Sequence, residues 1–365
     1  MNILISIFET VVRLVTWPLA ALPGSLAYKI GETGGRLVFW LWPGRRRIAL
    51  ENIEKSLALG ALPAGRTARD LALGYFGHMG RSFIEILKIY HGRTDHACDV
   101  VRVEGEEHYL KARAGKRGLI MITGHCGNWE LLGLAMARRY STRYSVVARA
   151  QNNPFLERIV DKIRAAGGNN IIYKQGAVRR ILTELKHGGM IGILIDQAVL
   201  VKEGCAVDFL GRPAMTTKLP ALIARKTGAP VLPVFIHRED RGGHAIVFHP
   251  EVELSRTENK ETAVVEDMQK MTGFIEDYIL AHPEQWLWGH RRWKRAPERI
   301  FPPAGSSTDP TGAGAQEQEN HGPQQEKHGR GNVRQGGNYN QSFRKDEPGQ
   351  VPHRQNGPGG DQGQK

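Results

Sequence analysis

Cysteine is scarce in this chain. Its 365 residues include three, Cys98, Cys126 and Cys205, which are widely separated. Such a set cannot form a disulfide framework, and its spacing matches no common metal cluster. An odd number of cysteines suits a reducing compartment, in which small buried thiols are ordinary core residues. We therefore expect no structural disulfides, and we predict no metal or other cofactor.

The sequence also lacks the motifs of several function classes. There is no Gly-x-Ser-x-Gly, so a serine nucleophile elbow is absent. No helix-turn-helix, zinc-finger or RNA-recognition signature occurs, and aromatic residues are not interleaved for base stacking. The formal net charge of +13 nevertheless indicates an anionic partner. Anionic phospholipid and an acidic carrier protein are the expected partners, and we predict no nucleic acid binding.

Apolar residues become rare in residues 303–365, which are rich in Gly, Gln, Asn, Pro and Ser. This segment contains seven Lys or Arg and seven Asp or Glu residues, so the net charge belongs to residues 1–302. It cannot bury enough apolar surface to offset the entropy lost on ordering it. We therefore predict a disordered tail.

The N-terminus lacks an uninterrupted membrane-spanning run. Residues 3–22 are mostly apolar, but Glu9 and Arg13 interrupt them four residues apart, and charges at mid-bilayer are costly. A cleaved signal peptide is not expected, because the basic start is missing. A second apolar run with two tryptophans, residues 37–42, precedes three consecutive arginines, as is typical of a cytoplasmic membrane interface. We predict that residues 1–44 anchor the chain, monotopically or as a single span; a buried helical bundle is the alternative.

The rest of the chain predicts helices and then alternating strands and helices. Residues 67–90 carry apolar residues at helical spacing, within a helical region at 45–95. The alternation predicts an α/β domain at 45–302, with a mixed, mostly parallel open sheet flanked by helices. The expected strands are 118–123, 145–148, 170–173, 190–195, 230–236 and 245–248, and the expected helices between them are 128–139, 154–166, 178–186 and 218–227.

The segment after the strand at 118–123 holds the best catalytic pair. His125 and Glu130 lie five residues apart, which would separate them by about 140° on a continuous helix. A turn directly after the histidine, and a helix capped by Asn128, would place the glutamate in the first helical turn, where the helix dipole keeps it ionised. A carboxylate at one imidazole nitrogen raises the basicity of the other. This spacing predicts that Glu130 orients His125 as a general base.

Alternatives to this pair remain open. Taken alone, a His-x4-Glu pattern is weak, and a structural histidine is the simplest alternative. Cys126 is a second candidate nucleophile, although nothing marks a partner base for it. A metal site built from these residues would lack any usual zinc spacing. Because no elbow serine is present, direct attack by a substrate hydroxyl on a bound acyl group is favoured over an acyl-enzyme.

Three polar residues follow expected strands by one or two positions, namely His125, Arg149 and Asp196. In open α/β sheets, ligands bind beyond the carboxyl ends of the strands. We therefore expect these three side chains at one rim of the sheet.

Several segments, in order over residues 5–297, resemble the lipid A biosynthesis acyltransferases. These are Kdo-dependent late lauroyl or myristoyl transferases within the lysophospholipid acyltransferase superfamily. The tail from about residue 303 matches nothing in that family. The matching segments are Arg47-x4-Asn52, Gly124-His125-x4-Glu130, Arg149-x-Gln151-Asn152-Asn153-Pro154, Ile195-Asp196-Gln197, Val207 to Ala214 with Thr216-Thr217, Thr227 to Val231, and Pro283 to Lys294.

The resemblance implies transfer of a fatty acyl chain from acyl carrier protein to a hydroxyl of a lipid A precursor, on the cytoplasmic side of the inner membrane. It implies that His125 is the general base and Glu130 its partner. It also places Arg149, Arg164 and Asp196 at polar positions of the site, where a guanidinium can stabilise an oxyanion or bind a phosphate. A solvated helix face for Arg164 and a structural cap for Asp196 are the alternatives.

Two later segments have less specific patterns. Residues 209–213 predict a loop that bends the chain back over the sheet rim. Residues 286–294 combine three tryptophans with cationic residues and a histidine, which suits either a docking surface for lipid or carrier protein, or plain C-terminal packing.

Other functions are compatible with the same residues. An acyltransferase for another lipid acceptor, such as a lysophospholipid or a glycolipid, would use the same chemistry. From a different class, a thioesterase or a non-catalytic lipid-binding protein is the alternative.

Overall fold

A computed structural model describes residues 2–93, 101–115, 117–150, 153–174, 176–240 and 242–296. Cys98 and the tail predicted from residue 303 onward lie outside these ranges. The two other cysteines, Cys126 and Cys205, are buried and free.

A seven-stranded sheet, in the order β1-β9-β8-β2-β5-β3-β4, forms the centre of the fold. Strands β8, β2, β5, β3 and β4 are mutually parallel, β9 is antiparallel to β8, and β1 runs parallel to β9. The predicted mixed, mostly parallel sheet is therefore confirmed. The strands are β1 (Val101–Glu104), β2 (Leu119–Thr123), β3 (Ser145–Ala148), β4 (Asn170–Tyr173), β5 (Met190–Leu194), β8 (Val231–Arg238) and β9 (His244–Phe248).

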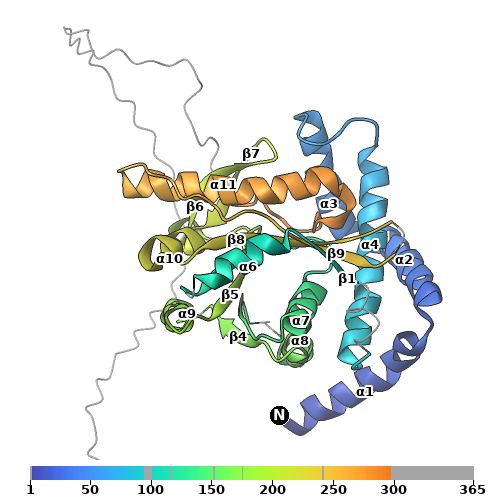
Figure 1. The fold of residues 1–365 in the computed structure, drawn as a ribbon. Helices are drawn as coiled ribbons and strands as arrows, with labels where there is room; N and C mark the ends of the chain where they lie inside the picture. Colours follow the sequence, from blue (N-terminus) through green and yellow to red (C-terminus); the bar gives the residue numbers. More distant parts are fainter. Residues whose placement is uncertain are drawn as a thin grey trace, which may run out of the picture. The chain divides into compact units, whose positions relative to one another are not determined.

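Helices cover both faces of the sheet (Figure 1). Strand β2 is buried throughout, and its alternate residues point to opposite faces. Ile120 and Ile122 pack into the core that contains α9, α10 and α11, whereas Leu119 and Met121 pack into the core that contains α6, α7 and α8. The helices are α6 (Glu106–Ala114), α7 (Trp129–Arg139), α8 (Pro154–Ala165), α9 (Ala177–Lys186), α10 (Leu219–Thr227) and α11 (Lys260–Ala281).

The N-terminal region is helical, as predicted. Its helices are α1 (Asn2–Ala21), α2 (Gly24–Leu41), α3 (Pro43–Ala58) and α4 (Ala68–Tyr90). Thr67 and Asp70 form a capping box that begins α4. Helix α2 packs closely on α4. The approach is so close that a Cβ added at Gly35 would lie 2.0 Å from the carbonyl oxygen of Phe76. Glycine at this position lets the two backbones approach each other.

Helix α1 contacts the rest of the protein through apolar and charged side chains, and it leaves several large apolar residues exposed. Glu9 forms ion pairs with Lys162 and Arg158 of α8. Leu14 is 70% exposed and Trp17 is 55% exposed. The segment Leu4–Ala21 is long and apolar enough to cross a membrane. Large apolar side chains that stay exposed on one helix suit contact with lipid.

A separate β-hairpin replaces the loop predicted at residues 209–213. Strands β6 (Gly204–Phe209) and β7 (Arg212–Thr217) pair in antiparallel register. Leu210 and Gly211 connect them with φ values of +52° and +71°. Two consecutive positive φ values are typical of a tight hairpin turn, so the glycine supports strand pairing here and not an open loop. Two short 3₁₀ helices, η1 (Val201–Glu203) and η2 (Pro283–Gln285), complete the described elements.

Candidate active site

The predicted turn and helix cap after β2 are confirmed. Helix α7 begins at Trp129, and the side-chain oxygen of Asn128 accepts a hydrogen bond from the Leu131 backbone N–H at 3.2 Å. Gly127 has a φ of +57°, and a Cβ there would lie 2.0 Å from the carbonyl oxygen of Ile236. The sequence therefore needs glycine at this position in order to turn sharply from strand to helix.

Asp196 holds the imidazole of His125. The Nδ1 atom of His125 lies 2.7 Å from Oδ1 of Asp196, and the backbone N–H of His125 donates to Oδ2 at 2.7 Å. His125 follows β2 and Asp196 follows β5, and these strands are parallel neighbours. Their carboxyl ends therefore meet at one rim, as the sequence predicted for these two residues.

Asp196 is ionised within the protein core. Its side chain is 2% exposed, and Nε1 of Trp286 donates to Oδ2 at 2.8 Å. Burial alone raises the pKa of this carboxyl, but electrostatic attraction to His125 and the hydrogen bonds from His125 and Trp286 outweigh it, so the net pKa lies well below its usual value. An ionised acceptor at Nδ1 requires that this nitrogen carries a proton, so the neutral imidazole has its lone pair on Nε2.

The second ring nitrogen of His125 accepts a hydrogen bond from an exposed side chain. Nε2 of Gln197 lies 3.0 Å from Nε2 of His125, so the amide donates to the imidazole lone pair. The His125 side chain is 15% exposed, and Gln197 is exposed. The ring of Trp129 contacts the imidazole edge to face, with centroids 4.9 Å apart. A hydroxyl that replaces the Gln197 amide could donate its hydrogen to Nε2.

Glu130 is bound to Arg164 and does not hold His125, contrary to the expectation from the His-x4-Glu spacing. Nη2 of Arg164 lies 3.0 Å from Oε1 of Glu130, and Nε of Arg164 lies 3.2 and 3.3 Å from the two carboxylate oxygens. Both side chains are mostly buried, at 20% and 15% exposed. The physical reason is the direction of α7, whose first turn presents Glu130 to α8, while the neighbouring strand β5 supplies the carboxylate for His125.

Arg149 directly follows β3, whose neighbour in the sheet is β5. It therefore lies at the carboxyl rim, as predicted, and it is exposed. Its guanidinium has no hydrogen bond or ion pair within the described part of the chain. Such a cation is available to an anionic ligand at this rim.

A cavity opens between the sheet and helices α7 and α8. Its walls are largely apolar, with Met121, Leu132 and Leu194 among them, and the Glu130–Arg164 pair also lines it. Trp129, which contacts the His125 imidazole, also lines the cavity, so the apolar cavity adjoins the histidine. This combination suits a reaction in which a long apolar group and a hydroxyl must meet.

Two sequence alternatives are resolved by burial. The Cys126 side chain is 1% exposed, and burial raises the pKa of its thiol well above the usual value, so it is a poor nucleophile. In the segment of residues 286–294, Trp286, Trp288 and Arg292 are at most 1% exposed. These three side chains therefore serve packing, whereas Arg291 and Lys294 of the same segment are exposed.

Sequence reasoning missed the roles of Gln197 and Trp286 at His125 and Asp196. Both residues lie within segments that carried the family resemblance, but nothing in their spacing indicated contact with the histidine. The sequence indicated Asp196 as a site residue because it follows a strand, but it did not indicate that Asp196 bonds to His125.

Comparison with known proteins identifies the family. The family model for bacterial lipid A biosynthesis acyltransferases matches residues 2–295. The chain belongs to this family. It is accordingly an acyltransferase.

The relatives of this acyltransferase include enzymes with two kinds of named acceptor. The phosphatidylinositol mannoside acyltransferase of Mycobacterium tuberculosis H37Rv is 27% identical over 250 residues, covering 67% of this chain and 77% of that protein. The lipid A biosynthesis lauroyltransferase of Escherichia coli K12 is 23% identical over 291 residues, covering 78% and 91%. The lipid A biosynthesis palmitoleoyltransferase of the same organism is 25% identical over 285 residues, covering 78% and 90%.

A solved structure also shows a weak likeness. The 1-acyl-sn-glycerophosphate acyltransferase PlsC of Thermotoga maritima is 17% identical, covers 68% of this chain and 97% of its own, and has a TM-score of 0.33. A score this low supports no structural inference.

Proposed function

We propose that this acyltransferase moves a fatty acyl chain from acyl carrier protein to a hydroxyl of a lipid A precursor, with His125 as general base. The observation that carries the proposal is the bond between Nδ1 of His125 and buried Asp196, which leaves Nε2 free at the carboxyl rim. The acceptor hydroxyl displaces the amide of Gln197 and donates to Nε2.

The reaction proceeds by direct attack. The acceptor oxygen forms a bond to the thioester carbonyl carbon while its proton moves to Nε2 of His125. The tetrahedral intermediate then breaks its C–S bond, and the imidazolium returns the proton to the leaving thiolate. The products are an ester and a free thiol. Asp196 stabilises the transient imidazolium because it stays ionised next to Nδ1.

Cationic and apolar parts of the site bind the substrates. Arg149, exposed and unpaired within the described residues, stabilises the oxyanion or binds a substrate phosphate. The cavity beside α7 and α8 accepts the acyl chain, with the Glu130–Arg164 pair in its wall. This role keeps both residues in the site without requiring contact between Glu130 and His125.

We also propose that α1 and α2 hold the body at the cytoplasmic face of the inner membrane. Both helices present large apolar side chains to solvent, including Leu14, Trp17 and Trp40, and Trp42 directly after α2 is also exposed. Arg45 lies 5.6 Å from the ring centroid of Trp42, at the start of α3. Tryptophan next to arginine is suited to anionic lipid headgroups. Because Glu9 is paired with α8, the interface is a better position for α1 than the bilayer centre.

A second acceptor class is a mannosylated phospholipid, favoured by the identity of 27% to the mycobacterial phosphatidylinositol mannoside acyltransferase. The two acceptors are distinguished with purified protein, lauroyl-acyl carrier protein and either lipid A precursor or phosphatidylinositol mannoside in mixed micelles. Mass spectrometry then identifies the acylated product.

Each outcome of this assay decides between the alternatives. Transfer to the lipid A precursor that disappears in His125→Ala supports the proposal. Transfer to the mannoside alone supports the second candidate. Release of free fatty acid without any acceptor would instead indicate a thioesterase, and undiminished function in His125→Ala would contradict general-base catalysis.

A further inference from the structure

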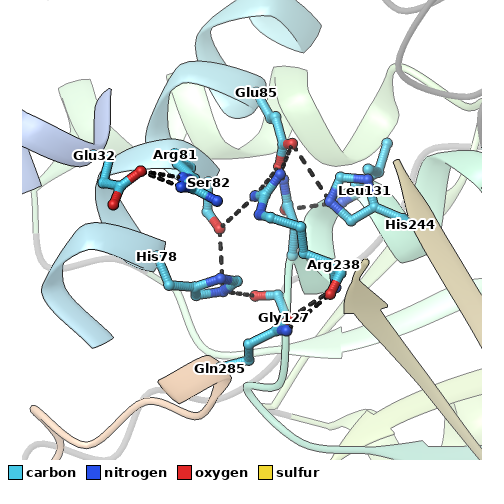
Figure 2. A network of polar contacts seen from close by, with 11 residues as sticks. Glu32, His78, Arg81, Ser82, Glu85, Gly127, Leu131, Arg238, His244 and Gln285 are labelled. Carbon is cyan, nitrogen blue, oxygen red and sulfur yellow. Dashed lines mark hydrogen bonds and ion pairs between the residues drawn. The ribbon is translucent and has the colours of Figure 1, made fainter. Parts of the chain in front are cut away.

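Helix α4 presents three polar side chains to the turn that carries His125. His78, Ser82 and Glu85 follow one another at intervals of four and three residues, so they share one face of the helix. All three are buried, and Glu85 has no exposed surface. Figure 2 shows them directed toward the turn and toward Arg238 at the end of β8.

Glu85 is bonded to the residue that caps α7. Nδ2 of Asn128 donates to Oε2 of Glu85 at 2.8 Å, while Oδ1 of the same asparagine caps the helix. Glu85 also pairs with both terminal nitrogens of Arg238, and Nε2 of His244 lies 3.4 Å away. Burial raises the pKa of Glu85, but the charges and hydrogen bonds of Arg238 and His244 together outweigh this effect, so the net pKa is lowered and the carboxylate is ionised. Asn128 therefore donates to a fixed negative charge.

His78 holds the preceding residue of the turn. Its Nε2 lies 3.2 Å from the carbonyl oxygen of Gly127 and donates to it, while Ser82 Oγ lies 3.3 Å away. Burial, together with the Arg238 charge, lowers the pKa of His78 to about 3, so the imidazole is neutral at physiological pH. The backbone N–H of Gly127 donates to the carbonyl oxygen of Gln285 at 2.7 Å. Both backbone polar groups of Gly127 are thus fixed.

The network continues through Gln285 to the strand. Its side chain makes two bonds with the backbone of Arg238, accepting from N–H at 2.8 Å and donating to the carbonyl at 3.0 Å. Leu287 closes the other side, where its N–H donates to the carbonyl oxygen of His125 at 3.2 Å. The turn therefore has buried polar partners from α4 on one side and from residues 285–287 on the other.

Stability alone is a poor explanation for these groups. Burying an ion pair costs desolvation energy that its attraction roughly offsets, and apolar replacements are often equally stable. Directional bonds to the turn do what apolar packing cannot, because they fix the position of particular backbone atoms. We propose that Glu85 and His78 are positioning residues, which act through Asn128 and Gly127 to aim the His125 imidazole at the reacting hydroxyl. This inference rests on the proposed general-base function.

The test removes each bond while preserving the shape of the site. Glu85→Gln removes the charge, Asn128→Ser keeps a helix cap but is too short to reach Glu85, and His78→Leu removes the donor to Gly127. We expect each variant to lower kcat by about tenfold to a hundredfold, with KM for donor and acceptor within about twofold, because a small misplacement of a catalytic group slows chemistry without weakening binding. His78→Gln keeps a donor near Nε2 and should retain most of the activity.

A matched control separates positioning from stability. Asp267 has no exposed surface and pairs with Arg225 and the Ser255 backbone, away from the turn. Asp267→Asn therefore also removes a buried carboxylate from an arginine. We expect it to lower the melting temperature without the fall in kcat. The double variant Glu85→Gln/Asn128→Ser should be no slower than the slower single variant, because one change weakens and the other removes the same contact between Glu85 and Asn128.

Hydrogen exchange supplies a measurement that does not depend on activity. In full-length protein, we expect Glu85→Gln and His78→Leu to speed amide exchange in peptides that cover residues 119–134, and Asp267→Asn to leave it unchanged. Equal effects of Glu85→Gln and Asp267→Asn on kcat and exchange would overturn the proposal, as would additive effects in the double variant. If wild-type protein transfers no acyl group, the proposed function fails, but accelerated exchange still identifies the groups that fix the turn.

Discussion

Nδ1 of His125 lies 2.7 Å from Oδ1 of Asp196, although the two residues are 71 positions apart in the chain. The contact exists because β2 and β5 are parallel neighbours and both end at the same rim. A carboxylate from one strand end thus serves a histidine from the next, in the manner of active sites built on open α/β sheets. Glu130, which is closer in sequence, is occupied by Arg164.

Asp196→Asn should remove most of the activity. An asparagine amide can donate to Nδ1, which would select the tautomer with hydrogen on Nε2 and so abolish the base. We expect kcat to fall by about two to four orders of magnitude, the range for general-base catalysis. Single-turnover acyl transfer measures the effect. Trp286→Phe, which removes one hydrogen bond to Asp196, should cost less. Activity of Asp196→Asn within threefold of wild type would contradict this assignment.

Glu130 and Arg164 should behave as a unit. Each is the other's ionic partner, so removing one leaves the second charge unpaired in the cavity wall. We expect the double variant Glu130→Gln/Arg164→Gln to have a kcat/KM no lower than that of the worse single variant. A double-mutant cycle measures this coupling. Coupling of Glu130→Gln with Asp196→Asn instead would show that Glu130 acts on the histidine.

Gly127→Ala should unfold the turn. Its positive φ costs an alanine about 1–2 kcal/mol, and the new Cβ would also lie 2.0 Å from a backbone oxygen. We expect destabilisation by more than about 2 kcal/mol and loss of activity. Gly176 is the matched control, because its φ is +70° and no atom lies within 4 Å of an added Cβ. Gly176→Ala should cost about 1 kcal/mol, measured by chemical denaturation; equal costs for the two variants would contradict the clash.

Glu276 should make stability depend on pH. Burial raises the pKa of this carboxyl to about 7, with the nearby charges of Asp208 and Asp277 raising it further and that of Arg292 lowering it. Its Oε1 accepts the backbone N–H of Leu210, in the hairpin turn, at 2.6 Å. Because the pKa is higher in the folded than in the unfolded state, the contribution is complete below about pH 4.5 and is lost as the pH rises through about 7.

Glu276→Gln tests this dependence, because the amide imitates the protonated acid and keeps an acceptor for Leu210. We expect the variant to be more stable than wild type at pH 8 by about 1 kcal/mol, a value discounted for partial exposure. The difference should vanish near pH 5. Denaturation at the two pH values measures it, and an equal difference at both would rule out titration of Glu276.

The outward face of α1 should determine membrane binding. Leu14 is 70% exposed, and replacing it by glutamate would remove apolar area from a lipid contact and add a negative charge near anionic headgroups. We expect Leu14→Glu to lower the partition coefficient onto anionic vesicles by roughly tenfold. Leu222→Glu on α10, at an apolar residue that is 49% exposed, is the control and should leave binding unchanged. Equal binding of both variants would exclude α1 as the docking face.

The sequence by itself determined the alternating α/β architecture, because strands and helices impose local periods of two and 3.6 residues that a single segment records. It also placed the turn at Gly127 and the cap at Asn128, since glycine adopts the positive φ of a sharp turn and an asparagine side chain can cap the first N–H groups of a helix. The hairpin at residues 204–217 was missed, because its tight turn was interpreted as an open loop.

Only the tertiary structure decided which carboxylate serves His125. Local spacing favoured Glu130, five residues away, but strand order brings Asp196 to the imidazole and α8 brings Arg164 to the glutamate. In the same way, the helical pattern of residues 67–90 contains Glu85 but does not indicate its partner, because its bond to Asn128 depends on how α4 packs against the turn. Such pairings depend on which elements become neighbours in space. The pattern of side chains within one segment does not indicate which other segment will pack against it.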